Sequence, residues 1–294
     1  MAAWLLSRSL FPVAFAAALG GTLLGLQQGV SEGRILGVII VCTIVVVVVF
    51  ERLLPEHPDW NVSQGDVGTD LVHGVVSSTI HELLKVGLHV AFIGLAAWLS
   101  ELVGGSLWLM DWPLLLQLAL ALVISQFGEY WAHRAMHELP PLWRLHATHH
   151  SPGRLYWLNA SRFHPLDAVI LLTVALTPLI VLGVGSDALL LFAVWVSVHG
   201  LFQHCNIRLR LGPLNYLFSM AELHRWHHSL SLEEANSNYG NNILFWDLVF
   251  RTVHYPKDRE ASAEIGLSDL PGFPKDYLGQ LLSPWRWERN QEGG

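Results

Sequence analysis

Long apolar runs alternate with short polar connections up to about residue 205, after which the chain is soluble in character. A run of roughly 20 apolar residues is long enough to cross the hydrocarbon core of a bilayer as a helix. The pattern therefore predicts a polytopic membrane protein. The predicted spans are residues 10–26, 35–50, 84–103, 112–126, 166–184 and 187–202.

The flanks of these runs refine the prediction. Residues 66–85 mix charged and aliphatic side chains and indicate an interfacial helix that continues into the third span. The fourth span continues without a proline as far as His133, and glycines near residue 184 turn the last two runs into a hairpin. The first run follows Arg8 and resembles a signal peptide, but it lacks a convincing cleavage site. We expect a spanning helix, with cleavage as the alternative.

Composition supports a membrane location. Of 294 residues, 52% are apolar and only 14% are charged. The formal net charge of −7 and the lack of basic blocks exclude nucleic-acid binding, and two cysteines argue against a disulfide framework. We expect an all-α, polytopic integral membrane protein with about four to six transmembrane helices and a cytosolic histidine-rich helical cap.

The distribution of positive charge predicts the orientation. Of the 17 lysine and arginine residues, all but Arg34 lie on the side of the histidine-rich segments or at its boundary. Cytoplasmic loops of membrane proteins carry an excess of such residues. We therefore expect the histidine-rich cap and both termini to face the cytoplasm.

The densest chemical signal lies at residues 133–150, which contain His133, His137, His146, His149 and His150. Histidines three or four positions apart on a helix point from the same face. Two prolines at positions 140 and 141 break the helix between the pair and the triplet, so the two sets can converge. A second triplet with the same spacing follows much later, at His224, His227 and His228.

This repeated spacing predicts a polyhistidine metal site. A lone histidine among apolar residues is most often a core residue or a helix cap, but neutral imidazole is also the commonest metal ligand. Eight imidazoles exceed the number of ligands that one ion accepts, which is about four for zinc and about six for octahedral metals. Two metal ions are therefore implied. The residues alone suit iron, zinc, copper and nickel equally.

The motifs HRAMH (133–137), HATHH (146–150) and HRWHH (224–228) enclose a membrane hairpin between the last two. This combination resembles the fatty acid hydroxylase or sterol desaturase superfamily of membrane histidine-box di-iron oxygenases. The first two motifs are eight residues apart, and the chain also contains the sequences RFHPLD and NYGNNILFWDLVFRT. These features are similar to those of the bacterial, sterol-desaturase-like branch of the superfamily. The resemblance covers about residues 66–255.

The resemblance implies a non-haem di-iron centre that uses O2 to attack a C–H bond of a lipid. By motif position, the implied iron ligands and catalytic residues are His133, His137, His146, His149, His150, His224, His227 and His228. His204, near the end of the hairpin, is the next candidate ligand. His199 is a further candidate ligand. It lies five residues before His204, whereas some members of the superfamily have two histidines four residues apart near the end of the hairpin. A hydrogen bond to the backbone is its alternative role. His164 in RFHP also matches a recurrent position, with hydrogen bonding to a ligand as the alternative.

Polar residues near the motifs are candidates to orient the imidazole N–H groups. Glu129 precedes His133 by four residues and Glu222 precedes His224 by two; a solvated or helix-capping charge is the alternative for each. Further candidates to support the ligands or the cap are Asp167, Asn236, Asn238 and Asp247.

Three functions are compatible with the sequence. The leading hypothesis is a membrane lipid hydroxylase that acts on a sterol, fatty acyl, sphingolipid or ether-lipid chain. The second is a desaturase on the same site, and the third is a histidine-rich metal-binding or transport protein. Motifs at helix ends, outside the middle of the spans, favour an enzyme. No GxGxxG or CxxC motif is present, so we expect a separate electron-donor protein.

The resemblance also suggests the division of the chain. We expect N-terminal membrane helices and a connecting loop at 1–65, a catalytic domain at 66–255 and a C-terminal cytosolic tail at 256–294. The expected cofactor is two iron ions, with zinc possible in purified protein. The expected location is the bacterial inner membrane, with the histidine site on the cytoplasmic face.

Overall fold

The computed structural model describes residues 1–292. Within them the secondary structure is helical, and pairing between extended segments is limited to three isolated bridges, which confirms the all-α prediction. The long helices are α1 (Ala2–Gln27), α2 (Glu32–Leu53), α3 (Val67–Val103), α4 (Leu114–Glu138), α6 (Pro165–Val181) and α7 (Ser186–Gln203). The short helices are α5 (Pro140–His150), α8 (Ala221–His227), α9 (Leu232–Ala235), α10 (Phe245–Phe250), α11 (Tyr277–Leu282) and α12 (Trp287–Glu292). Four 3-10 turns complete the set: η1 (Pro58–Asn61), η2 (Trp157–Ser161), η3 (Gly212–Tyr216) and η4 (Ser283–Trp285).

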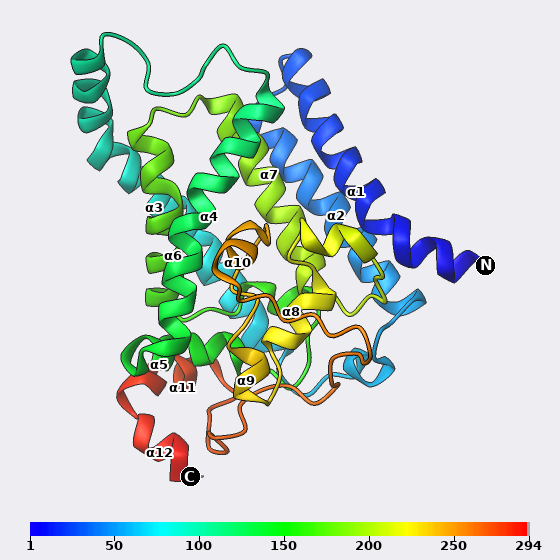
Figure 1. Ribbon diagram of the computed structural model, residues 1–294. Helices are drawn as coiled ribbons and strands as arrows, with labels where there is room; N and C mark the ends of the chain where they lie inside the picture. The colour runs from blue at the N-terminus through cyan, green and yellow to red at the C-terminus, as the bar shows by residue number, and fades with distance from the viewer. Residues whose placement is uncertain (293–294) are drawn as a thin grey trace.

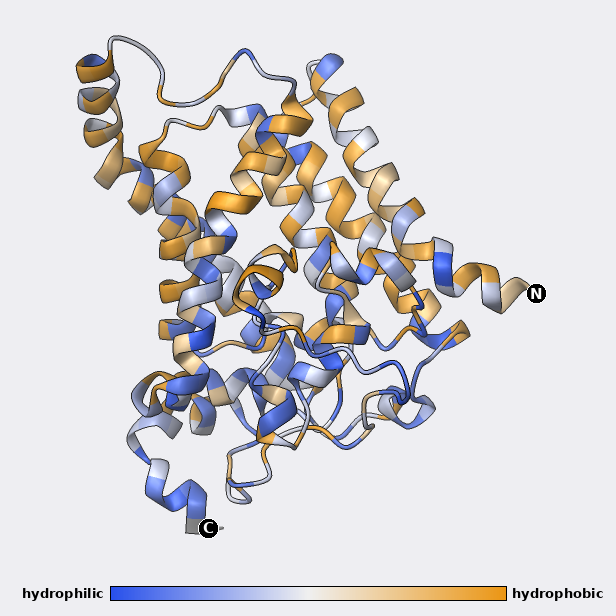
Figure 2. Ribbon diagram, in the orientation of Figure 1, coloured by the Kyte–Doolittle hydropathy of each residue, from blue (hydrophilic) through white to orange (hydrophobic). Residues whose placement is uncertain are grey.

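The long helices make the chain a multi-pass membrane protein. Within residues 1–292, five of them, α1 to α4 and α7, are long and apolar enough to cross a membrane, whereas α6 is apolar but has 17 residues. The α1–α2, α3–α4 and α6–α7 connections lie together at the upper end of Figure 1, opposite the short helices. Figure 2 shows apolar residues concentrated in this upper part and polar residues in the lower part. The molecule thus has a membrane end and a polar end.

Helix α3 joins two predicted segments. Its 37 residues form one continuous helix, with the expected interfacial part and the expected span in line. At 1.5 Å per residue it is about 55 Å long, well beyond the roughly 30 Å of a hydrocarbon core. The second half carries exposed Leu83, Val86, Val90 and Ile93, as expected of a surface that faces lipid. The first half carries the buried Asp70 and lies against α6 and η2.

Two apolar cores hold the bundle. One joins α1, α2 and α7 through side chains that include Phe11, Phe15 and Val194, and the other joins α4, α6 and α7 around Leu118 and Leu191. Gly128 permits the close approach of α4 and α6, because a Cβ at this position would lie 2.7 Å from the carbonyl oxygen of Val174.

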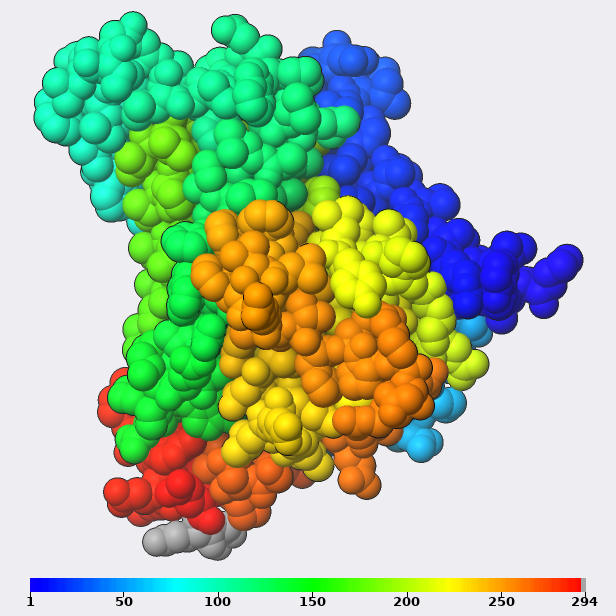
Figure 3. Space-filling model, in the orientation of Figure 1, coloured from blue at the N-terminus to red at the C-terminus, as the bar shows by residue number. Residues whose placement is uncertain are grey.

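The short helices form a cap at the polar end of the bundle. Helix α4 ends at Glu138 and α5 begins at Pro140, so the predicted proline break occurs where expected. Helices α8 to α10 follow α7, and Figure 3 shows the yellow and orange segments as a continuous surface over the centre and lower right of the viewed side. Trp287 of α12 packs with Ala147 of α5. The cap therefore covers the ends of α4 and α7.

Candidate metal centre

The cap and the adjoining helix ends bring nine of the predicted histidines into two groups. In the described part of the chain, each histidine of a group offers one nitrogen within 4.8 Å of the others. The five-histidine group consists of His133, His137, His146, His150 and His227. The four-histidine group consists of His149, His204, His224 and His228. Except for the partly exposed His137, these side chains are at most 3% exposed.

Two helices contribute to both groups. In α5, His146 and His150 point to the five-histidine group, while His149 between them points to the four-histidine group. The division is reversed at α8: His224 and His228 belong to the four-histidine group, and His227 belongs to the five-histidine group. Residues four apart on a helix lie nearly above one another, whereas the residue three positions along is rotated in the other direction. This offset sends each triplet toward two points.

The five-histidine group points nitrogen lone pairs at its centre. His133 Nδ1 lies 2.8 Å from the carbonyl oxygen of Tyr239, and His227 Nδ1 lies 2.8 Å from that of Ser237. A carbonyl oxygen only accepts, so each Nδ1 carries the proton and each neutral ring presents a bare Nε2. The two Nε2 atoms lie 3.0 Å apart, and His133 Nε2 is also 3.0 Å from His146 Nε2. Such a cluster of lone pairs is repulsive unless a cation lies among them.

In the four-histidine group, too, Nδ1–H groups point outward and Nε2 atoms face the centre. The Asn159 amide donates to the Arg154 carbonyl, which fixes its oxygen as the acceptor of the His204 Nδ1–H at 3.2 Å. His149 Nδ1 donates to the carbonyl oxygen of Arg162 at 3.3 Å. The Nε2 atoms of His204 and His224 lie 2.8 Å apart, and those of His224 and the neighbouring His228 lie 3.0 Å apart.

Burial keeps the cap histidines neutral. It lowers the pKa of His204 to about 3. The pKa values of six further cap histidines lie well below the usual range. The main cause is burial, and the second is the positive charge that neighbouring histidines would carry. The six are His146, His149, His150, His224, His227 and His228. Neutral imidazole is the form that binds a metal ion, so no proton has to leave before binding near pH 7.

The donor set fits two transition-metal ions. Two nitrogens at adjacent octahedral positions, about 2.1 Å from a metal, lie about 3.0 Å apart, which matches the Nε2 separations. The Nε2 atoms of His137 and His150 are buried and without a hydrogen-bond partner, and a metal would supply that partner. Nitrogen donors suit iron, zinc, copper or nickel better than magnesium or calcium. The predicted pair of metal sites therefore has a geometric counterpart.

Comparison with known proteins agrees with this geometry. A family model described as fatty acid hydroxylase matches residues 118–252, a segment that contains all nine histidines. Ornithine lipid hydroxylase OlsE from Rhizobium tropici is 35% identical over 264 residues, which cover 87% of this chain and 77% of that protein. The chain belongs to the fatty acid hydroxylase family.

More distant relatives match over shorter segments. Alkylglycerol monooxygenase from Danio rerio is 30% identical over 174 residues, 58% of this chain and 37% of that enzyme. Delta(7)-sterol-C5(6)-desaturase from Nicotiana tabacum is 28% identical over 151 residues, 49% of this chain and 51% of that enzyme. No solved structure matches. The predicted superfamily is confirmed, and this member of the fatty acid hydroxylase family is a membrane-bound, oxygen-dependent lipid oxidoreductase of the hydroxylase and desaturase type.

Two of the predicted ligands lie outside both groups. His164 is the N-cap of α6, where its Nδ1 accepts from the backbone N–H of Leu166 and its Nε2 lies 3.1 Å from the carbonyl oxygen of Leu281. His199 lies one turn before the end of α7 and is fully buried against Phe11, with neither ring nitrogen paired. In this fold His204, at the C-cap of α7, reaches the four-histidine group instead.

Among the residues considered as supports for the ligands, two contact them directly. Asp167 Oδ2 lies 2.8 Å from His146 Nδ1, and Asn236 Oδ1 lies 3.2 Å from His137 Nδ1. Glu129 instead hydrogen-bonds with Gln126 one turn earlier in α4. The remaining candidates bind the cap itself.

Those cap contacts are local. Glu222 accepts from Asn215 and Tyr255, and Asn238 donates to the carbonyl oxygens of Leu223 and His254. The left-handed backbone at Asn238 (φ 51°) is a conformation that asparagine tolerates better than most residues.

Sequence reasoning missed the supports that act through the main chain. The carbonyl oxygens of Arg162, Ser237 and Tyr239 carry no signal in the residue type, because every residue has one. Asn159 has a polar side chain, but nothing in its position predicts a contact with His204, 45 residues later.

Proposed function

We propose that each histidine group holds one iron ion and that the resulting two-iron centre hydroxylates an unactivated C–H bond of a membrane lipid. The observation that carries this proposal is the convergence of nine imidazoles on two points, with the Nδ1–H groups of four of them, His133, His149, His204 and His227, donating outward to carbonyl or amide oxygens. Iron, among the metals that suit imidazole, is the choice supported by membership of the fatty acid hydroxylase family. When bound, the iron pair would supply the electrons and the oxidising power that O2 needs to attack an alkyl chain.

The chain's own contribution is to hold and orient the histidine rings and to enclose the site. Backbone carbonyls fix the Nδ1 proton of His133 and His227, so their Nε2 lone pairs face the centre. Eight of the nine rings are buried, which excludes bulk water from an oxidising site. His133 lies at the polar end of α4, so the site is just beyond the apolar bundle and within reach of the end of a lipid that enters from the membrane.

The substrate class follows from the family and the location. The Rhizobium tropici relative, aligned over 77% of its length, is named an ornithine lipid hydroxylase. We propose a polar membrane lipid as the substrate of this chain, with ornithine lipid as the first to be tested. The alkylglycerol monooxygenase match extends over a smaller share of either protein and makes ether lipids the second choice.

We further propose that a separate redox protein delivers the electrons on the cytoplasmic side of a bacterial inner membrane. The chain has two cysteines, Cys42 on α2 and Cys205 beside His204, whereas an iron–sulfur cluster usually takes four thiolates, so they offer no internal iron–sulfur relay. The excess of lysine and arginine at the capped end supports the orientation.

A desaturase is the second candidate, because a sterol desaturase is among the matched relatives. It would use the same groups and differ in product: loss of two hydrogens instead of gain of one oxygen atom. A metal transporter is disfavoured because the ligands lie at helix ends and in the cap, whereas transporters place ion sites near the middle of the bilayer.

The test combines metal and lipid analysis. The full chain is produced in iron-supplemented cells that contain ornithine lipid, purified in detergent, and compared with a His149→Ala/His150→Ala variant that removes one ligand from each group. We expect about two irons per wild-type chain and a lipid that gains one oxygen atom, with both lost in the variant. A lipid that instead loses two hydrogens would establish the desaturase, and folded wild-type protein that binds no metal would disprove the centre.

A further inference from the structure

The four-histidine group is held by a segment of chain between α5 and α6. This supporting segment, residues 154–162, includes η2. Asn159 accepts a hydrogen bond from His204, and the carbonyl oxygen of Arg162 accepts one from His149. Two of the four ligands therefore take their ring orientation and their tautomer from the supporting segment.

Two aspartates at the start of α3 anchor the supporting segment. Asp70, which is fully buried, accepts from Arg162 Nε at 2.5 Å and from the Tyr156 hydroxyl at 2.6 Å. Asp66 binds the guanidinium of Arg154 through both oxygens, at 2.6 and 3.1 Å. These arginines are only 3% exposed, and buried charge pairs of this kind fix position because neither partner tolerates the loss of the other.

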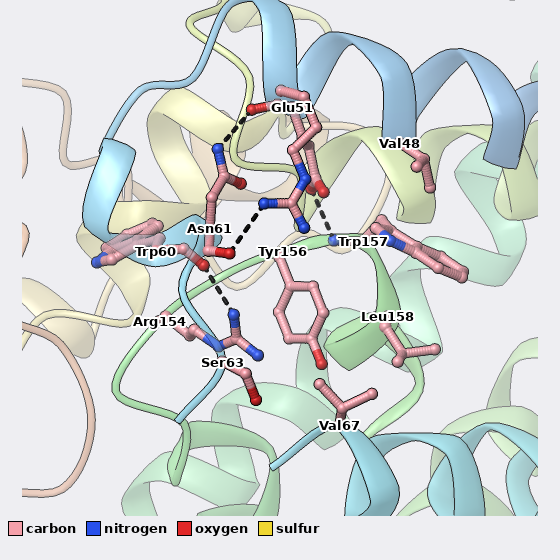
Figure 4. A pocket seen from close by; sticks show the side chains of 11 residues that line it. Val48, Glu51, Trp60, Asn61, Ser63, Val67, Arg154, Tyr156, Trp157 and Leu158 are labelled. Atoms are coloured by element: carbon pink, nitrogen blue, oxygen red, sulfur yellow. Dashed lines mark hydrogen bonds between the residues drawn. The ribbon is translucent and has the colours of Figure 1, made fainter. Parts of the chain in front are cut away.

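A third carboxylate ties the supporting segment to the end of α7. Glu51, at the end of α2, accepts hydrogen bonds at 2.9 Å from the backbone N–H groups of Trp157 and Asn206. Asn206 follows the ligand His204 by two residues, so one carboxylate clamps both stretches of chain that hold this ligand. Figure 4 shows Glu51 directed at Trp157, and the carbonyl of Trp60 facing Arg154, around a cavity of about 210 Å³.

We propose that Glu51, Asp66 and Asp70 are positioning residues for the four-histidine group and set the affinity of its metal ion. All three precede residue 118, where the match to the fatty acid hydroxylase model begins, so the N-terminal part of this chain tunes a centre whose ligands lie wholly in the matched part. The inference rests on the proposed binding of metal by the two groups and does not depend on which lipid is oxidised.

The five-histidine group supplies a matched control. Its backbone support, the carbonyl oxygen of Tyr239, belongs to a loop that Asp247 clamps by accepting from the N–H groups of Tyr239 and Gly240 at 2.8 and 2.7 Å. Asp247 is as fully buried as Asp70. Each carboxylate holds a segment that supports one group, Asp70 through the side chains of Tyr156 and Arg162 and Asp247 through backbone N–H groups.

The experiment uses Co²⁺ as the probe and full-length protein in detergent, with one group disabled at a time. His133→Ala/His146→Ala leaves the four-histidine group to be titrated, and His224→Ala/His228→Ala leaves the five-histidine group. In the first background we expect Asp70→Asn to weaken Co²⁺ binding by about 10- to 100-fold and to change the visible absorption of bound Co²⁺. Asp247→Asn should leave both readouts unchanged there. In the second background the two variants should exchange effects.

Further variants separate positioning from general loss of structure. Asp70→Glu should recover part of the affinity because it keeps the charge, and Glu51→Gln should weaken the four-histidine group by a smaller factor than Asp70→Asn because one acceptor oxygen remains. An equal loss in both backgrounds, or no loss with Asp70→Asn, would overturn the positioning role. Absence of Co²⁺ binding in both unmodified backgrounds would instead contradict the metal centre on which the proposed function depends.

Discussion

The two histidine groups share two of the helices that carry their histidines but are held in place by different parts of the molecule. Helices α5 and α8 serve both groups. The five-histidine group hydrogen-bonds to the loop before α10, through the carbonyl oxygens of Ser237 and Tyr239. The four-histidine group hydrogen-bonds to Asn159 and Arg162, whose segment is anchored to α2 and α3. Shared ligand helices fix the distance between the groups, and separate supports allow each metal affinity to be adjusted alone.

The groups also differ in their number of ligands, and removing one ligand from each should have the largest effect. His150→Ala leaves four imidazoles in the five-histidine group, while His228→Ala leaves three in the other. We expect His228→Ala to weaken its ion by more than about 100-fold, beyond the usual effect of an outer contact, and His150→Ala to weaken its ion less. Lipid oxidation should fall below detection in His228→Ala. Metal analysis after dialysis and product analysis measure both effects, and equal retention of two ions in both variants would contradict the assignment.

Acid should affect both groups alike, because burial depresses the pKa of ligands in each. The pKa of His204 is about 3 in the folded chain and about 6.5 in the unfolded one, so below pH 6.5 the unfolded chain binds a proton that the folded chain does not. Stability is thus fully present above pH 6.5 and falls as the pH decreases toward 3, by about 1.4 kcal/mol per pH unit for each such histidine. Unfolding of metal-free protein in detergent between pH 7.5 and 5 measures this slope.

The control for the acid effect is His204→Gln, which removes one titrating group but keeps a side chain of similar polarity. We expect its stability to depend less steeply on pH, by about one histidine's share. An unchanged slope would show that this ring is already exposed to protons in the folded state.

Removing a carboxyl group that supports a histidine should have an intermediate effect. Asp167 is the carboxylate that contacts a ligand directly, 2.8 Å from His146 Nδ1, and both side chains are buried. Asp167→Asn should weaken the ion of the five-histidine group by about 10- to 100-fold and leave the four-histidine group unaffected. Co²⁺ titration in the two single-group backgrounds distinguishes these outcomes, and a loss at the four-histidine group would argue against separate supports.

The smallest effect is expected at Asn236. Its contact with His137 is 3.2 Å long, and the asparagine is exposed to solvent, so water can replace the amide. Asn236→Ala should change the affinity of the five-histidine group by no more than about 3-fold, less than Asp167→Asn in the same assay. An effect as large as that of Asp167→Asn would mean that His137 depends on this contact more than its geometry indicates.

The bundle was predictable in outline because membrane crossing and helix breaking are properties of local sequence. Apolar runs predicted α1, α2, α4 and the α6–α7 hairpin, and the two prolines predicted the break between α4 and α5. The extent of α3 was also predicted, as an interfacial helix over 66–85 that continues into a span. The sequence did not show that the buried Asp70 of this helix pairs with Arg162. That partner lies 92 residues away in the sequence.

For the metal centre, the sequence by itself determined the kind of donor: histidine triplets at helical spacing imply imidazole ligands, and the eight motif histidines imply two ions. Only the tertiary structure decided which imidazoles meet, because each group combines residues from segments distant in the sequence: His149 joins His224, and His227 joins His133. It also decided the supports, such as the carboxylate of Glu51 and the carbonyl of Arg162. Ligand type is a property of side chains, whereas hydrogen-bond partners distant in sequence exist only once the chain has folded.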